Sequence, residues 1–324
     1  MKITKKLINE FLDFYKNKNL SKSTIENYKR DIENFLTFFR NSDRSQIEEI
    51  DIKIIETYKS SLRKIKINSH SIYYGTNCFL SERTIQTKIQ PIKSFLYFVN
   101  VVYNIWMNYS YIKVPKAISQ HMDYFEINEI PKIREAIRQV EKSKINQIRQ
   151  ELLMVLSFTS WMRLSEMLKL KVEDVMNWKT NIVWKNKKER PVYFNDQCKE
   201  LLEIYLELRK QPNPCNWKIC KNKCKENYVF ISHNPRSFWR PISKSTVSEH
   251  NKLYNKVLNI PGKKYSTHTM RHSNATYMLE KWVNIRDIQK FLGHSYLQTT
   301  ETYLHIKDKK LEEKHNSLFK NLKI

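Results

Sequence analysis

The chain has 324 residues, and 58 lysines and arginines against 33 aspartates and glutamates give it a formal net charge of +25. A surplus of this size indicates a polyanionic partner, with nucleic acid as the first choice and an acidic membrane surface as the competitor. No apolar run approaches the roughly 18 residues of a membrane span, and no apolar leader opens the chain, which argues against a membrane protein. We therefore expect a cytoplasmic protein that contacts double-stranded DNA, and the length is sufficient for two domains.

Helical periodicity predicts four helices in the first third of the chain. Apolar residues recur at helical spacing in residues 4–17, from Ser21 or Ser23 to Phe39, in 52–62, and from Ser81 to Val99, with a polar loop over 65–80. We interpret the aromatic side chains of these stripes as core. Four helices with basic outer faces favour a DNA clamp, which would occupy residues 1–113.

A linker at 114–123 is marked by Pro115 and the polar run Gln120-His121-Met122. The second domain, residues 124–324, is predicted to open with helices over 127–140 and 145–159. Two alternating segments, 181–185 and 190–194, then predict a β-hairpin. Residues 311–322 predict a tail helix, which would be marginal in isolation.

The five cysteines are odd in number, which argues against a disulfide framework. Cys215, Cys220 and Cys224 cluster in a stretch rich in Lys, Asn and Pro, and could bind zinc if His233 or Cys198 supplied a fourth ligand. Because this spacing fits no common zinc pattern, we favour free thiols on a surface loop. No metal or other cofactor is expected.

The last quarter of the chain gathers groups suited to phosphate chemistry. His268 and Arg271 are three residues apart and share one face if helical, and Gly293 sits where a helix C-cap would turn the chain and present His294. An arginine can grip a phosphate in bidentate fashion, histidines can exchange protons, and the phenol of Tyr303 can attack phosphorus. A free phenol titrates near ~10 and needs a base and cations to react at neutral pH.

Any one of these residues alone is more often structural, but their order and spacing resemble the tyrosine recombinase (phage integrase-like) family. The signature of that family is H-x-L-R-H, then L-G-H, then a Tyr nine residues on. The matching residues are His268-Thr269-Met270-Arg271-His272, Leu292-Gly293-His294 and Tyr303, with Met270 in place of Leu. The resemblance extends more loosely to the N-terminal segment from Leu20 to Phe35.

Two further motifs support the resemblance. Arg163 by itself is either a helix-surface residue paired with Glu166, or a buried arginine that Glu166 orients toward an anion. The segment Ser160-Trp161-Met162-Arg163-Leu164-Ser165-Glu166 resembles the family's T-G-L-R-x-S-E, and Trp184-Lys185-Asn186-Lys187-Lys188-Glu189-Arg190 resembles its G-K-G-x-K-E-R hairpin. A lysine on a β-turn is usually only solvated. The resemblance implies a catalytic role for Lys185, with Lys187 as the alternative register.

The resemblance implies a mainly α protein, with an all-α SAM-like core-binding domain followed by a mostly α catalytic domain that contains a small antiparallel sheet. It also implies roles: arginines that hold the scissile phosphate, a histidine that assists deprotonation, a lysine general acid, a second histidine on the phosphate, and a tyrosine nucleophile. In that order the residues are Arg163 and Arg271, His268, Lys185, His294 and Tyr303, with Glu166 behind Arg163.

The function expected on this basis is that of a short Xer-like site-specific recombinase, which forms a 3′-phosphotyrosine intermediate and works as a tetramer on two synapsed DNA sites. A second recombinase or a DNA motor is a possible additional partner, and the tail at 311–322 would link subunits or pack within its own chain. Three alternatives stay open: a mobile-element integrase or transposase, a type IB topoisomerase-like enzyme, and a non-catalytic DNA-binding protein.

The chain is unusual in having 3 glycines and 7 tryptophans, since glycine averages about 7% of residues. Four tryptophans fall where the family has or tends to have glycine: Trp161, Trp184, Trp239 and Trp282. Glycine serves where a backbone needs positive φ or a close approach. We hypothesise that the source reads the codon UGA as glycine; the alternative is a divergent recombinase that tolerates the bulk.

Overall fold

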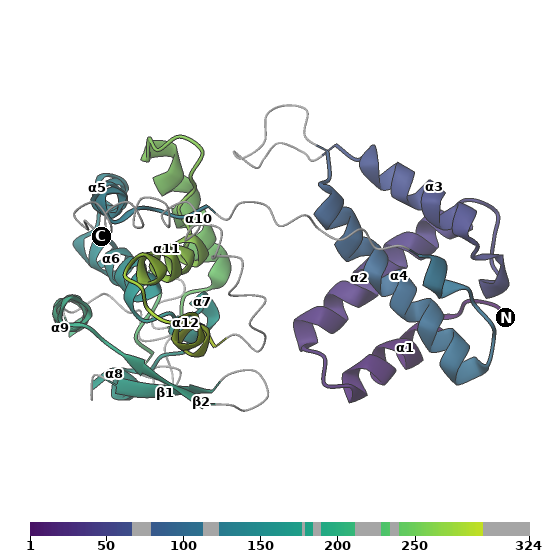
Figure 1. The fold of residues 1–324 in the computed structure, drawn as a ribbon, viewed down its shortest axis with the longest axis horizontal. Coiled ribbons are helices and arrows are strands. Elements are labelled where there is room, and N and C mark those ends of the chain that lie inside the picture. Colours follow the sequence, from purple (N-terminus) through teal and green to yellow (C-terminus); the bar gives the residue numbers. More distant parts are fainter. Residues whose placement is uncertain are drawn as a thin grey trace, which may run out of the picture. The chain divides into compact units, whose positions relative to one another are not determined.

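The computed structural model describes residues 1–66, 79–112, 123–176, 179–183, 189–210, 228–233 and 240–293 (Figure 1). Contacts divide the chain into two units, Met1–Gln120 and His121–Ile324. The described residues are mostly helical and include one antiparallel sheet of two strands. This agrees with the predicted fold class. None of the described helices combines the length and apolar character needed to cross a membrane.

The described residues of the N-terminal unit form four α-helices: α1 (Lys5–Asn17), α2 (Lys22–Arg40), α3 (Ile52–Arg63) and α4 (Glu82–Tyr103). Each begins directly after a residue whose side-chain oxygen accepts a hydrogen bond from a backbone N–H in the first turn. The four N-caps are Thr4, Ser21, Asp51 and Ser81. The predicted helices are therefore confirmed, and Ser21 rather than Ser23 begins the second. The predicted loop over 65–80 lies largely outside the described residues.

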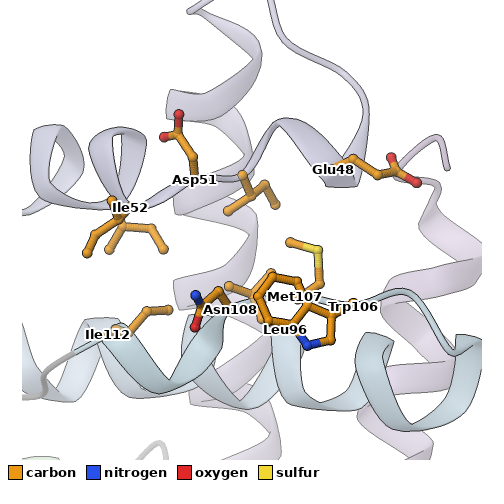
Figure 2. A pocket seen from close by; sticks show the side chains of 10 residues that line it. Glu48, Asp51, Ile52, Leu96, Trp106, Met107, Asn108 and Ile112 are labelled. Carbon is orange, nitrogen blue, oxygen red and sulfur yellow. The ribbon is translucent and has the colours of Figure 1, made fainter.

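The apolar stripes of these helices meet in one core, as expected. Phe11, Phe35 and Phe95 are fully buried, and the ring of Phe11 meets that of Phe95 edge-on at 5.3 Å between centroids. A pocket of about 470 Å³ opens beside α3 and the segment after α4, with Met107 and Trp106 among its lining residues (Figure 2). Its carboxylates are already engaged, since Glu48 binds the chain's N-terminal amine and Asp51 caps α3.

The C-terminal unit surrounds the central helix α6 (Lys144–Thr159), whose residues 148–157 are all buried. Around it pack α5 (Ile130–Val140), α9 (Asp196–Lys210) and α11 (Thr267–Glu280) (Figure 1). The other helices in the described part of this unit are α7 (Leu164–Met167), α8 (Val172–Met176), α10 (Lys244–Val257) and α12 (Ile285–Leu292). The helix predicted over 127–140 begins as a 3-10 turn, Ile127–Glu129, before α5.

The predicted hairpin is present as β1 (Lys179–Val183) and β2 (Glu189–Tyr193), paired antiparallel with Ile182 opposite Arg190. The first strand is already formed two residues before its predicted start, and the second begins and ends one residue earlier than predicted, so these limits were wrong. Alternation identifies the faces of a strand, but the backbone ladder decides where pairing begins. Along β2, Arg190 and Val192 point to the buried face.

Candidate active site of the C-terminal unit

Arg163 stands at the N-cap position of the short helix α7, where Glu166 binds it twice. Its backbone N–H donates to Oε2 of Glu166 at 2.8 Å, and its Nη1 donates to Oε1 at 3.1 Å. The predicted pairing is thus present. The prediction of a buried Arg163 is wrong, because its side chain is 35% exposed while that of Glu166 is 12% exposed. Glu166 holds the base of the arginine, and its outer part remains accessible.

Arg271 lies on α11 and is the buried member of the predicted arginine pair, at 3% exposure. Its guanidinium donates to the backbone carbonyls of Trp161 and Leu292. Leu292 ends α12, where Gly293 adopts the left-handed conformation at φ 62° and forms the predicted cap. Carbonyls at a helix C-terminus carry partial negative charge and favour a cation. These two carbonyls therefore fix the plane of the Arg271 guanidinium.

A third arginine, Arg190 of β2, joins this frame, and the sequence analysis missed its role. Its Nη1 donates to the carbonyl of Phe291 at 2.8 Å, and its Nη2 donates to the Trp161 carbonyl at 3.0 Å and to Oε2 of Glu166 at 2.9 Å. Its side chain is 8% exposed, and burial lowers its pKa, an effect that Glu166 opposes. The sequence feature that could have revealed this role was a charged residue, Arg190, on the predicted buried face of an alternating strand.

The guanidinium groups of three arginines therefore donate to one carboxylate and three backbone carbonyls. The donors are Arg163, Arg190 and Arg271. The carboxylate is that of Glu166, and the carbonyls are those of Trp161, Phe291 and Leu292. Three cations against one anion leave the cluster with excess positive charge. The planar fork of arginine matches the geometry of a phosphate. The arrangement can thus hold a phosphate group, and Arg163 is the member of the cluster whose side chain is partly exposed.

His268 lies on α11 one turn before Arg271, in the helix that Ser266 caps by accepting from the N–H of Thr269. Its ring meets the ring of His272 edge-on at 4.2 Å between centroids. Desolvation by the surrounding protein, then the charges of Arg271 and Arg163, lower the pKa of His268 below its ordinary value of 6.5. An imidazole held neutral in this way can accept a proton at neutral pH.

Several predicted residues lie outside the described part of the chain. They are Lys185 and its alternative Lys187, His294, Tyr303, the cysteines Cys215, Cys220 and Cys224, the tryptophans Trp184 and Trp239, and the tail at 311–322. The structure therefore brings together Arg163, Glu166, His268 and Arg271, and the other roles stay predictions.

The two residues considered as a fourth zinc ligand are both described. Cys198 is buried beside Thr159, and burial raises the pKa of its thiol to about 11. His233 hydrogen-bonds the hydroxyl of Tyr205 at 3.1 Å, and burial lowers its pKa to about 4. A protonated thiol is a poor metal ligand. Among the described residues no group of three or more His, Cys, Asp or Glu is placed to hold a metal ion.

The chain is similar to tyrosine recombinases over nearly its whole length. The Tyrosine recombinase XerC of Caldanaerobacter subterraneus subsp. tengcongensis is 27% identical over 322 residues, covering 96% of this chain and 86% of that protein. The Tyrosine recombinase XerD of Staphylococcus saprophyticus is 28% identical over 316 residues, covering 96% of this chain and 97% of that protein. Both span nearly the whole chain.

Solved structures support the fold. A post-cleavage complex of the XerH site-specific recombinase with its palindromic difH substrate matches with a TM-score of 0.66 and 22% identity, covering 93% of this chain and 82% of that one. A lambda integrase dimer bound to a COC′ core site matches with a TM-score of 0.65 and 15% identity, covering 94% and 95%.

Family profiles agree with the motifs. The N-terminal SAM-like domain of phage integrases matches residues 8–100, and the phage integrase family matches residues 123–310, more than half of the chain. The second match covers the guanidinium cluster, both histidine motifs and Tyr303. The resemblance read from the sequence is confirmed, and the chain belongs to the phage integrase family of tyrosine recombinases.

Proposed function

We propose that this protein is a site-specific DNA recombinase that cleaves and rejoins DNA through a 3′-phosphotyrosine intermediate. The observation that carries the proposal is the cluster in which Glu166 and the Trp161 carbonyl tie Arg163, Arg190 and Arg271 together. Family membership and relatives across nearly the whole chain support the same reaction.

In the proposed reaction, Arg163 and Arg271 bind the non-bridging oxygens of the scissile phosphate. Negative charge on these oxygens grows as the phosphorus becomes pentavalent, so fixed guanidinium groups bind the transition state more strongly than the substrate. Glu166 keeps Arg163 in position, and the carbonyls of Trp161 and Leu292 do the same for Arg271. In this way Arg163 and Arg271 stabilise the negative charge of the transition state.

The proton transfers balance without an added reactant. The Tyr303 oxygen forms a bond to phosphorus while the bond from phosphorus to the 5′-oxygen breaks. His268, neutral at working pH, assists in removing the phenolic proton, Lys185 gives a proton to the departing 5′-oxygen, and His294 hydrogen-bonds the phosphate. Because a phosphoester replaces a phosphoester, the reaction reverses on a new 5′-hydroxyl, and no nucleotide is consumed.

The assembly is also proposed. The helical N-terminal unit would clamp DNA as a core-binding domain, in keeping with the net charge of +25. Four subunits on two synapsed sites, linked by the tail at 311–322, would exchange strands in pairs in the cytoplasm. A second recombinase or a DNA motor would act on the same complex.

Covalent trapping tests the function. A pool of nicked suicide DNA substrates is incubated with the wild type, Tyr303→Phe and the matched control Tyr296→Phe, and the products are separated on a denaturing gel. We expect a protein–DNA band with the wild type and the control, and none with Tyr303→Phe, which still binds DNA. The sequence of the captured DNA separates a defined site from the unselective cleavage of a topoisomerase.

Absence of the band from a folded wild type that binds DNA would favour the architectural alternative. A mobile-element integrase uses the same residues and would give the same band. The captured sequence would separate the two, since a chromosomal site points to resolution and the ends of an element point to transposition.

A further inference from the structure

Two tryptophans adopt a backbone conformation that suits glycine. The φ angle is 54° at Trp161 and 60° at Trp282. Among the described residues, the other non-glycine positions with positive φ are Asn19, Asp43 and Asn104, which are of the types that tolerate this region. A bulky side chain there brings Cβ too close to the following carbonyl oxygen, and glycine avoids the clash.

Both tryptophans also stand at the helix position where glycine is most common. Ser160 is the C-cap of α6 and Lys281 is the C-cap of α11, so each tryptophan is the residue that follows a C-cap. Beyond α11, the N–H of Trp282 donates to the carbonyl of Leu279 at 3.0 Å, and that of Val283 donates to Met278 at 3.0 Å. These two hydrogen bonds define a Schellman motif, which usually places a left-handed glycine where Trp282 stands.

Residue 161 contributes to the guanidinium cluster through its backbone. Its carbonyl accepts hydrogen bonds from Arg190 and Arg271, and its backbone is in the left-handed conformation. Its indole stacks on Phe291 at 4.4 Å between centroids and donates to Asn274. The carbonyl contacts require only the backbone, so a residue without a side chain provides them equally well.

The low glycine content of the chain also supports glycine at these two positions. The chain has 3 glycines in 324 residues, where an average protein has about 7%. The two described glycines, Gly262 and Gly293, both have positive φ. Glycine is therefore used here where the backbone demands it, and two demanding positions are written as tryptophan.

We propose that glycine occupies positions 161 and 282 in the protein as its source makes it, because UGA codons there are read as glycine. We further propose that residue 161 is a positioning residue of the recombination reaction, which acts through its carbonyl on Arg271 and Arg190. Only this second part rests on the proposed function.

The coding DNA tests the first part directly. We expect TGA at codons 161 and 282, and a glycine mass at these positions in peptides of the protein isolated from its source. TGG at both codons, or a tryptophan mass in the natural peptides, overturns the recoding.

Matched variants test the backbone argument on the purified chain. Trp161→Gly is compared with Trp161→Ala, and Trp282→Gly with Trp282→Ala, because both members of a pair lose the indole and only alanine keeps a Cβ. We expect each glycine variant to melt about 2–4 °C above its alanine partner. Equal melting temperatures within both pairs would show that the left-handed conformation does not demand glycine.

The same four variants test the positioning role through single-turnover cleavage at saturating DNA. We expect Trp161→Gly to cleave about tenfold faster than Trp161→Ala, because a small displacement of reacting groups costs much rate. The Trp282 pair should cleave at equal rates, and all four should bind DNA with equal Kd. Equal rates within the Trp161 pair overturn the positioning role. Loss of cleavage in all four variants would contradict both the positioning role and the proposed function. The melting temperatures would still decide whether positions 161 and 282 require glycine.

Discussion

At the scale of single residues, the guanidinium of Arg190 connects separate segments of the cluster. It donates to three acceptors, the carbonyls of Phe291 and Trp161 and the carboxylate of Glu166. A lysine ammonium is a point charge and cannot match this planar fork. The sequence distance to Phe291 explains why reading the chain did not reveal this role.

Arg190→Lys should therefore lower the free energy of unfolding by about 2–4 kcal/mol, because largely buried acceptors lose their hydrogen-bond partner. Urea unfolding followed by fluorescence measures the change. Arg286→Lys, on the exposed side of α12, is the matched control and should stay within about 0.5 kcal/mol of the wild type. A similar small change for Arg190→Lys would contradict its structural role.

The pH dependence of cleavage should report His268. Because desolvation and the charges of Arg271 and Arg163 lower the pKa of His268, the pH at which cleavage falls to half its rate should lie below 6.5. The rate should fall toward lower pH, as the imidazole takes up its proton. Single-turnover rates across pH measure this, with His272→Gln expected to keep the profile and His268→Gln to lose it. A wild-type midpoint above 6.5 would contradict the assignment.

At the scale of elements, features with local causes were predicted well and features with tertiary causes were not. The N-caps Ser21 and Ser81 and the stop at Gly293 follow from hydrogen bonds within a few residues, and each is observed. The exposure of Arg163 depends on packing between segments far apart in sequence, and the strand limits depend on the backbone ladder of the hairpin, which alternation does not fix. Local chemistry therefore located the helices, and only the structure showed how Arg190 joins the site.

Helix α11 carries both His268 and Arg271, and its first turn depends on Ser266. Ser266→Ala should cost about 1 kcal/mol of stability and lower the cleavage rate, because the fraying turn contains His268. Ser243→Ala removes the equivalent cap of α10 and should cost similar stability without slowing cleavage at saturating DNA. Chemical denaturation and single-turnover assays of both variants make the comparison. Equal effects on cleavage would show that only global stability matters.

At the scale of the whole molecule, the net charge of +25 makes phosphate contacts the main source of DNA affinity. The logarithm of the binding constant should fall linearly with the logarithm of salt concentration, with a slope of about −0.9 for each phosphate neutralised. Arg163→Ala should reduce the slope by about one. Fluorescence anisotropy titrations at several salt concentrations test this, and an affinity that is insensitive to salt would contradict the expected mode of binding.

In the proposed reaction, the guanidinium cluster binds the DNA phosphate that Tyr303 attacks. The most direct measurement is mass spectrometry of the peptide that remains joined to DNA after trapping, with the chain as written and with Trp161→Gly and Trp282→Gly combined. We expect a 3′-phosphate attached to Tyr303, with a higher yield from the glycine-containing chain. A phosphate attached to another residue, or no adduct from either folded chain on DNA that both bind, would contradict the proposed reaction.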